Sequence, residues 1–307
     1  MQIIKNFSNI PPCALALGNF DGLHIAHRKI INSCINFSKN NNLKSGVLLF
    51  ENHTQNFFKK DKISLLTTLD EKINILKALG VDFICLMPFD EKVMKMSPED
   101  FFDFLTDKLN AKAIFAGYDY TFGYKAMGNI SLLSELSRKK NIYLDISDKV
   151  TLKNDVVSST KIRDLIDSGK IKEANEFLDR PYSMTGEVVL GKQNGRKMGL
   201  PTANVKVNEE KLLPPDGVYK GKTIIDKKEY KSLINIGKNP TFNAENRTVE
   251  SHIPGFSDNL YGKKITVKFL DKIRDEKKFL SVDELINQIN KDLEKIWIVR
   301  ILLCIWL

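Results

Sequence analysis

The sequence predicts an α/β protein in which a doubly wound, mostly parallel sheet is followed by a small six-stranded antiparallel β-barrel with a C-terminal helix. Two observations carry this prediction. Up to about residue 180, short apolar segments alternate with segments of helical spacing, which is the pattern of βα units. After Pro181, short alternating segments are separated by Gly, Pro and Asn turn residues, which is the pattern of a small barrel. A chain of 307 residues is long enough for two domains, which we expect at residues 1–180 and 181–307.

Five apolar segments are expected to form the strands of the first domain. They span residues 14–17, 46–50, 83–87, 113–116 and 142–146. Helical spacing runs from about residue 23 to 31, over 70–79 with Gly80 just beyond its end, and over 132–138. Ser97 and Pro98 mark a further helix start, with Ser as N-cap and Pro at the first position. One more helix opens at Ser158 and is expected to end near Gly169.

The second domain is expected to contain six strands and one helix. The strands span 182–190, 203–207, 217–225, 230–236, 248–252 and 264–269. An amphipathic helix over 281–295 can lie against this barrel. The last segment, 296–307, is apolar except for Arg300 and is too short to span a bilayer, which takes roughly 20 residues. It can pack as a terminal helix, touch a membrane, or reflect an altered reading frame.

Composition and charge are those of a soluble globular protein, with 42% hydrophobic and 28% charged residues. The net charge of +9 suits nucleic acid, an acidic membrane surface or polyphosphate substrates. Because the lysines are spread along the chain, a generally solvated basic surface fits better. Cys13, Cys34, Cys85 and Cys304 lack metal or redox spacing, which indicates reduced thiols in a cytoplasm. The N-terminus lacks the pattern of a signal peptide.

Segment 14–31 organises the first domain, because it combines an apolar strand, a glycine-containing turn over 18–22 and a helix start. His24 and His27 lie at i and i+3, so they share one helix face in the first turn. The N–H groups and the dipole at a helix N-terminus attract anions, so these imidazoles suggest a phosphate site. A zinc pair, or one buried and one exposed histidine, is the alternative, although zinc on a helix more often uses i and i+4.

Two further segments place polar residues where ligands bind on such sheets. The loop 117–128 follows the fourth strand, and doubly wound sheets bind ligands at the carboxyl ends of their strands. Residues 158–163, SSTKIR, open a helix, where hydroxyls are most often plain caps. Arg163 lies one turn into that helix and can reach an anion that the helix N-terminus attracts.

These motifs, with a second set in the barrel half, resemble the family of bifunctional bacterial riboflavin kinase/FAD synthetases. The matching segments of the first half are GNFDGLH at 18–24, GYDYTFG at 117–123 and SSTKIR at 158–163. Those of the second half are GRKMGLPTAN at 195–204, GVY at 217–219, NIG at 235–237, PTF at 240–242, ESH at 250–252 and LYG at 260–262. Each segment is weak alone, but their joint presence in this order over residues 14–292 is specific. The resemblance implies a Rossmann-like nucleotidyltransferase sheet that adenylylates FMN to FAD and releases pyrophosphate, and a barrel that phosphorylates riboflavin to FMN.

The resemblance also implies roles for individual residues. ATP binding is assigned to Gly18, Asn19, Phe20, Asp21, Gly22, His24, His27, Ser158, Ser159, Thr160 and Arg163 in the first half, and to Gly191, Gly195 and Arg196 in the second. Flavin binding is assigned to Asp119, Phe122, His53 and Glu250. The catalytic groups are His24, His27 and Arg163 for adenylyl transfer and Glu250 as base for the kinase step; Thr202 and Asn204 are the Mg²⁺ ligands. Judged without the motif, Thr202 and Asn204 are an ordinary strand start and Glu250 is an exposed strand carboxylate. The implied enzyme is cytoplasmic, uses ATP and Mg²⁺ twice, and has riboflavin and FMN as small-molecule partners, with no nucleic acid and no stable membrane insertion.

Several positions depart from the family pattern. Ala26 replaces the glycine between the histidines, segment 50–54 lacks two prolines, Asn129 stands for an aspartate, and Pro254 and Gly255 follow the Glu-Ser-His motif. Ala26 motivates an alternative function, a riboflavin kinase with a weak or inactive adenylyltransferase half. A second alternative is a basic nucleic-acid-binding protein on a nucleotidyltransferase scaffold, which predicts salt-dependent binding of RNA or DNA.

Overall fold

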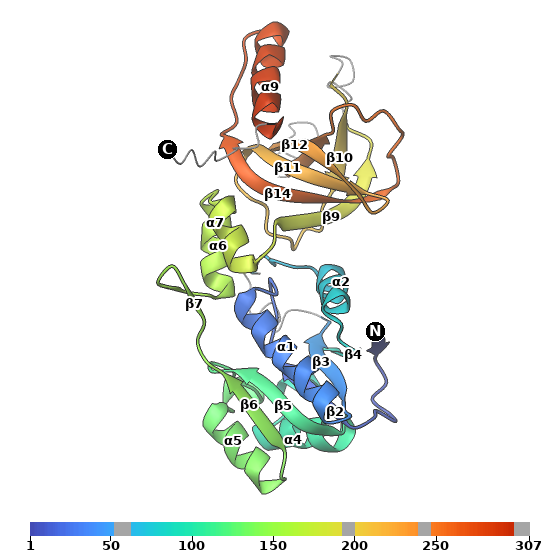
Figure 1. Cartoon of the computed structure of the whole chain (residues 1–307), viewed down its shortest axis with the longest axis vertical. Helices are drawn as coiled ribbons and strands as arrows, with labels where there is room; N and C mark the ends of the chain where they lie inside the picture. The colour runs from blue at the N-terminus through green and yellow to red at the C-terminus, as the bar shows by residue number, and fades with distance from the viewer. Residues whose placement is uncertain (52–62, 192–199, 239–246, 298–307) are drawn as a thin grey trace, which may run out of the picture. The chain divides into compact units, whose positions relative to one another are not determined.

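The computed structural model describes residues 1–51, 63–191, 200–238 and 247–297. The chain forms two compact units, Met1–Lys161 and Ile162–Leu307 (Figure 1). Within the four described ranges, no helix combines the length and the apolar character that crossing a membrane requires.

Unit 1 is built on a six-stranded parallel sheet, which confirms the doubly wound architecture. Its strands are β1 (Gln2–Ile4), β2 (Cys13–Leu17), β3 (Lys44–Phe50), β4 (Phe83–Met87), β5 (Ala111–Gly117) and β6 (Tyr143–Ser147), in the order β1-β4-β3-β2-β5-β6. β2 and β4 are buried at every position, as strands of a parallel sheet covered on both faces should be. The prediction of five strands missed β1, because three residues show no periodicity and only their pairing with β4 defines them.

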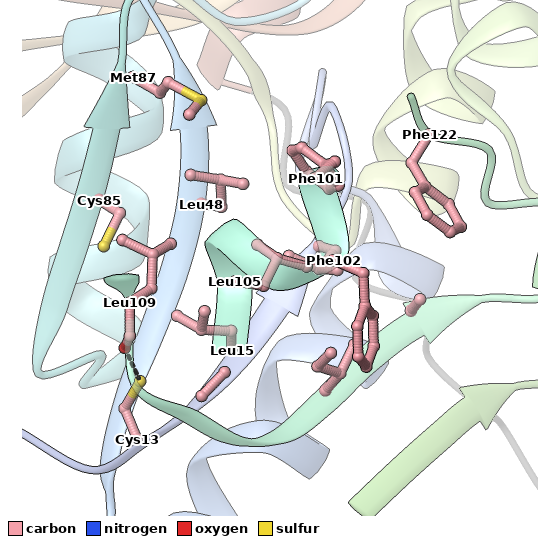
Figure 2. Close-up of a cluster of buried hydrophobic side chains, with 14 of the residues drawn as sticks. Cys13, Leu15, Leu48, Cys85, Met87, Phe101, Phe102, Leu105, Leu109 and Phe122 are labelled. Carbon is pink, nitrogen blue, oxygen red and sulfur yellow. Dashed lines mark hydrogen bonds between the residues drawn. The ribbon is translucent and has the colours of Figure 1, made fainter. Parts of the chain in front are cut away.

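Helices cover both faces of this sheet. They are α1 (Ile25–Asn40), α2 (Leu69–Leu79), α3 (Glu91–Met94), α4 (Pro98–Asp103), the π-helix η2 (Phe104–Lys108), the 3₁₀ turn η3 (Tyr124–Ala126) and α5 (Ile130–Lys139). α1 and α2 pack on Ala14 and Ala16 of β2, whereas α4, η2 and α5 pack on Leu15 and Leu17 of the same strand. Figure 2 shows the second cluster, in which Cys13 Sγ donates to the carbonyl of Leu109 at 3.1 Å. A two-stranded hairpin, β7 (Thr151–Leu152) with β8 (Asp155–Val156), follows the sheet.

The predicted helix ends are confirmed where capping chemistry defines them. Ser97 Oγ accepts the N–H of Asp100, and Pro98 occupies the first helical position of α4. Thr68 and Glu71 form a capping box at the start of α2. Gly80, with φ 88°, ends that helix in the left-handed conformation that favours glycine.

Unit 2 contains a closed six-stranded antiparallel barrel, as predicted. The strands are β9 (Tyr182–Val189), β10 (Thr202–Lys206), β11 (Gly217–Ile225), β12 (Lys228–Lys238), β13 (Arg247–His252) and β14 (Lys264–Arg274), and they close in the order β10-β13-β12-β11-β14-β9. Two short helices precede the barrel, α6 (Ser159–Asp167), whose first three residues belong to unit 1, and α7 (Ile171–Leu178). The sequence did not predict α7, which begins two residues after Gly169 at the expected end of α6.

The C-terminal helix α9 (Val282–Trp297) is attached to the barrel by apolar packing and by an ion pair. Ile296 packs with Val218 and Leu233 on the outside of the barrel. Arg274 Nε lies 2.8 Å from Oδ2 of Asp292, a fully buried carboxylate. The apolar tail therefore begins as the last turn of a packed helix, while residues 298–307 lie outside the described part of the chain.

Candidate active sites

The first candidate site lies where the strand order of the sheet reverses. From β2 the chain proceeds through β3 to β4 on one side, and later through β5 to β6 on the other. The loops that follow β2 and β5 therefore leave neighbouring strands at the same edge of the sheet. Ligands of doubly wound sheets bind at this switch point. The loop 18–24 and the loop 117–128 occupy the expected position.

The loop 18–24 is held in a strained conformation. Phe20 has φ 47° and Leu23 has φ 43°, in the left-handed region that side chains with a Cβ disfavour, and both residues are buried. Each such residue costs about 1–3 kcal/mol, so surrounding contacts must maintain the loop. Strain that is maintained at a loop of this kind is typical of ligand-binding sites.

Asp21 supplies most of those contacts. Its side chain is 1% exposed, and its oxygens accept the N–H groups of Leu66 and Thr67, both at 3.0 Å, and the hydroxyl of Thr67 at 3.1 Å. The Thr67 hydroxyl in turn accepts the N–H of Gly22 at 2.9 Å. The carboxylate of Asp21 thus ties the loop to the segment before α2.

The two histidines stack at the start of α1. The sequence predicted His24 in the first helical turn, but it is the N-cap of α1. Its backbone is extended, and its Nδ1 accepts the N–H of His27 at 3.4 Å. The two rings are 3.6 Å apart between centroids and 17° from parallel. A ring nitrogen that accepts a hydrogen bond carries no proton, so this contact assigns the proton of the His24 ring to Nε2. This arrangement places two imidazoles at a helix N-terminus, where anions are favoured.

The helix start at 158–163 contacts the same loop. Ser158 caps this helix, because its Oγ accepts the N–H of Lys161 at 3.2 Å. Ser159 Oγ donates to the carbonyl of Asp21 at 2.8 Å, which joins the beginning of α6 to the loop 18–24. Thr160 is the next residue of α6, and Arg163 lies one turn after Ser159 on that helix.

The loop 117–128 divides its predicted flavin residues between surface and core. Asp119 is exposed and lies two residues after Gly117, the last residue of β5. Phe122 is 5% exposed and packs with Phe101 and Tyr120, at 5.9 Å between ring centroids in each case. The ring of Phe122 therefore packs in the hydrophobic core and supports the loop, and its assignment to flavin binding stays a prediction. His53 lies outside the described residues.

The second candidate site is a row of polar side chains on the outer face of the barrel. In the strand register Asn204 of β10 pairs with Glu250 of β13, and Glu250 pairs with Asn235 of β12. Paired residues of neighbouring strands point to the same face, and Thr202 shares that face with Asn204. Thr202 Oγ1 donates to Oε2 of Glu250 at 3.4 Å. In the sequence Asn235 stands out only as part of the NIG motif, whereas the strand register places it beside the carboxylate of Glu250.

Two neighbours fix the start of this row. A Cβ at Gly191 would overlap the side-chain amide of Asn204, so glycine lets the chain after β9 pass close to that amide. Nδ1 of His252 lies 2.8 Å from the carbonyl oxygen of Pro201, which precedes Thr202. Gly195 and Arg196, the other predicted ATP contacts of this half, lie outside the described residues.

The fold and these two sites define a two-domain phosphate-handling transferase, with one site at a sheet switch point and the other on a barrel. The family model for FAD synthetase matches residues 7–161, and the model for riboflavin kinase matches residues 178–298. The chain belongs to the family of bifunctional riboflavin kinase/FMN adenylyltransferases, and it is an enzyme of the transferase class.

Relatives with both activities in their names align over nearly the whole chain. The bifunctional riboflavin kinase/FMN adenylyltransferase of Buchnera aphidicola subsp. Schizaphis graminum is 36% identical, over 96% of this chain and 97% of its own. The Bacillus subtilis protein of the same name is 33% identical, over 91% and 89% of the two chains. A crystal structure described as a macrolide-efflux protein from Streptococcus pneumoniae superposes with a TM-score of 0.86 and 31% identity, over 95% of this chain and 97% of its own. The name given to that structure describes a transport activity, so the similarity bears on the fold alone.

Proposed function

We propose that this chain phosphorylates riboflavin to FMN at the barrel site and then adenylylates FMN to FAD at the sheet site, with ATP as donor in both steps. The observation that carries the proposal is the coincidence of two family matches with two separately built polar sites in one chain. The functional division that we adopt is residues 1–180 for adenylyl transfer and 181–307 for the kinase. Membership of the family supports riboflavin, FMN and ATP as the small-molecule partners.

In the adenylyl transfer, a phosphate oxygen of FMN attacks the α-phosphorus of ATP and pyrophosphate leaves. An FMN phosphate is already a competent nucleophile, so the step needs alignment and charge stabilisation but no general base. The stacked pair His24 and His27, together with the helix N-terminus, is suited to bind the phosphates. Ser159 positions the loop, and Arg163 is the cation of α6 proposed to offset developing negative charge. The exposed Asp119 is proposed to contact the flavin.

In the kinase step, the riboflavin 5′-hydroxyl attacks the γ-phosphorus of ATP and ADP leaves. The hydroxyl must lose its proton as the bond forms, and the proposed acceptor is the carboxylate of Glu250. The hydroxyl of Thr202 donates to one oxygen of this carboxylate, which orients the other oxygen for the proton. The side chain of Asn235, next to Glu250 in the register, is placed to contact the same substrate group.

Thr202 and Asn204 fit a role as Mg²⁺ ligands. A hydroxyl and an amide oxygen are hard donors, which Mg²⁺ prefers. Because Gly191 has no side chain, the space next to the Asn204 amide stays free of a Cβ atom. Among the described residues no group of three or more His, Cys, Asp and Glu could hold a metal ion. Mg²⁺ is usually bound through few protein oxygens together with substrate phosphates and water. When bound, the ion would offset the negative charge of the polyphosphate.

A cytoplasmic location is part of the proposal. Cys13, Cys34 and Cys85 are free and buried. Burial raises the pKa of all three thiols, so they remain protonated and unreactive. Buried reduced thiols are typical of proteins in a reducing compartment.

Product analysis of the purified full-length chain with riboflavin, ATP and Mg²⁺ tests the proposal. We expect FMN to form first and FAD to follow, and FMN supplied directly to yield FAD with release of pyrophosphate. FMN that accumulates without FAD supports the alternative in which Ala26 impairs the adenylyltransferase half. If a folded chain forms neither FMN nor FAD, the proposal is contradicted. Salt-dependent binding of RNA would then favour the nucleic-acid alternative.

A further inference from the structure

Lys72 is a buried cation beneath the loop 18–24. It lies in the first turn of α2 and is 8% exposed, and its Nζ donates to the carbonyl oxygen of Asn19 at 2.9 Å. Lysine is almost never buried to this degree unless a specific interaction holds the ammonium group. The interaction here spans 53 positions of sequence and reaches a loop of the candidate active site.

The segment 66–72 is hydrogen-bonded to this loop at three places. Leu66 and Thr67 bind the carboxylate of Asp21, and the Thr67 hydroxyl accepts the N–H of Gly22. Lys72 adds the third attachment, at the carbonyl of Asn19. The carboxylate of Glu71, the neighbour of Lys72, accepts the N–H of Thr68 in the capping box and is directed to the helix start.

The attachment made by Lys72 is the one closest to the ligand side of the loop. Gly18 is half-buried and Asn19 is exposed, whereas residues 20–24 are buried. In addition to the histidines and the helix start, a bound phosphate can reach the loop at Gly18 and Asn19, next to the peptide that Lys72 fixes. Because a peptide unit is planar, fixing the carbonyl of Asn19 also fixes the direction of the N–H group of Phe20.

We infer that Lys72 is a positioning residue for adenylyl transfer, which acts by holding the Asn19 carbonyl and thereby setting the conformation in which the loop 18–24 binds ATP phosphates. This inference rests on the proposed function of the sheet site. It extends the site to α2, a helix that carries none of the sequence motifs. A misplacement of reacting groups by about 1 Å lowers the rate about 100-fold, so loss of this hydrogen bond should mainly lower kcat.

The test uses the full-length chain, in which kinase activity measures the amount of intact unit 2 and circular dichroism of the urea transition measures the folding of unit 1. Lys72→Met removes the donor and should lower kcat for FAD formation from FMN about 10- to 100-fold, with KM for ATP changed less than about threefold. FMN formation from riboflavin should stay at the wild-type rate. Lys77→Met, an exposed lysine of the same helix, is the matched control and should leave both activities unchanged.

Two further variants separate positioning from packing. Lys72→Gln is polar but about one bond shorter, so it should also lose FAD formation; Lys72→Arg reaches as far as lysine and should recover to within about fivefold of wild type. A wild-type rate in Lys72→Met overturns the inference, as does a wild-type rate in Lys72→Gln should the Met variant fail to fold. If FAD formation does not recover in Lys72→Arg, the loss in the other variants is due to packing, and the inference is overturned as well. If the wild-type chain makes no FAD, the proposed function itself fails, and that result is distinct from an active wild type with active Lys72 variants.

Discussion

Asp21 gives the sharpest test of how the sheet site is built. Its substitution by Ala removes the acceptor of two buried backbone N–H groups, those of Leu66 and Thr67, and of the Thr67 hydroxyl. Leaving a buried donor without an acceptor costs about 1–3 kcal/mol, so the two amides together correspond to about 2–6 kcal/mol. We take about 4 kcal/mol as the expected loss in the free energy of unfolding of unit 1. For a unit of this size that loss lowers Tm by about 8–16 °C.

The assay follows unfolding of the full chain in urea with two probes. Trp297 and Trp306 are the two tryptophans of the sequence and both lie at its C-terminal end, so tryptophan fluorescence reports on that end, while circular dichroism reports on both units. Asp21→Ala should lower the urea midpoint of unit 1, which is seen by circular dichroism, and leave the fluorescence transition unchanged. FAD formation should fall while FMN formation continues. Asp148→Ala removes an exposed carboxylate of unit 1 and serves as control. A loss below about 1 kcal/mol in Asp21→Ala would refute the reasoning, because the buried amides would then not depend on this carboxylate.

Three further predictions concern the rest of the chain. Glu250→Gln should lower FMN formation about 100- to 10,000-fold and leave FAD formation from added FMN intact; near-normal turnover in the kinase assay would show that the base is another group. Ala26→Gly should lower the stability of unit 1 by up to about 1 kcal/mol and leave FAD formation within about twofold, and a tenfold rise in FAD formation would instead favour the impaired-adenylyltransferase alternative. Asp292→Ala leaves the guanidinium of Arg274 without its buried carboxylate and should destabilise unit 2 by about 3–5 kcal/mol in urea; an unchanged fluorescence transition would contradict the role given to this ion pair.

The sequence was most informative where one element is defined by its own residues. β4 and β11 lie at the expected positions because each is a run of strand-forming residues bounded by turns. β1 has no such internal signal and exists only through its pairing with β4. The start of α1 was placed about two residues early, because the sequence does not show that the side chain of His24 accepts the N–H of His27.

The candidate sites divide in the same way. Thr202, Asn204 and Glu250 could be predicted because they lie in recognisable motifs, and the strand register brings them to one face. Asn235 gained its place only from the pairing of β12 with β13. Lys72 could not be predicted, since in the sequence it is one more lysine of an amphipathic helix, and its hydrogen bond connects two segments that only the folded sheet brings together.

The two departures from the family motif that fall on described residues of the sheet site are both compatible with the backbone there. Ala26 lies inside α1 and needs no left-handed backbone, and alanine favours a helix over glycine by about 1 kcal/mol. Asn129 is the N-cap of α5 and accepts the N–H of Leu132 at 3.1 Å, as an aspartate would. Asparagine lacks only the interaction of a negative charge with the helix dipole, about 0.3–1 kcal/mol. An effect of Ala26 on catalysis would therefore have to arise from contact between its methyl group and the bound nucleotide. In Ala26→Gly such an effect would appear as a changed KM for ATP in an otherwise slightly less stable unit.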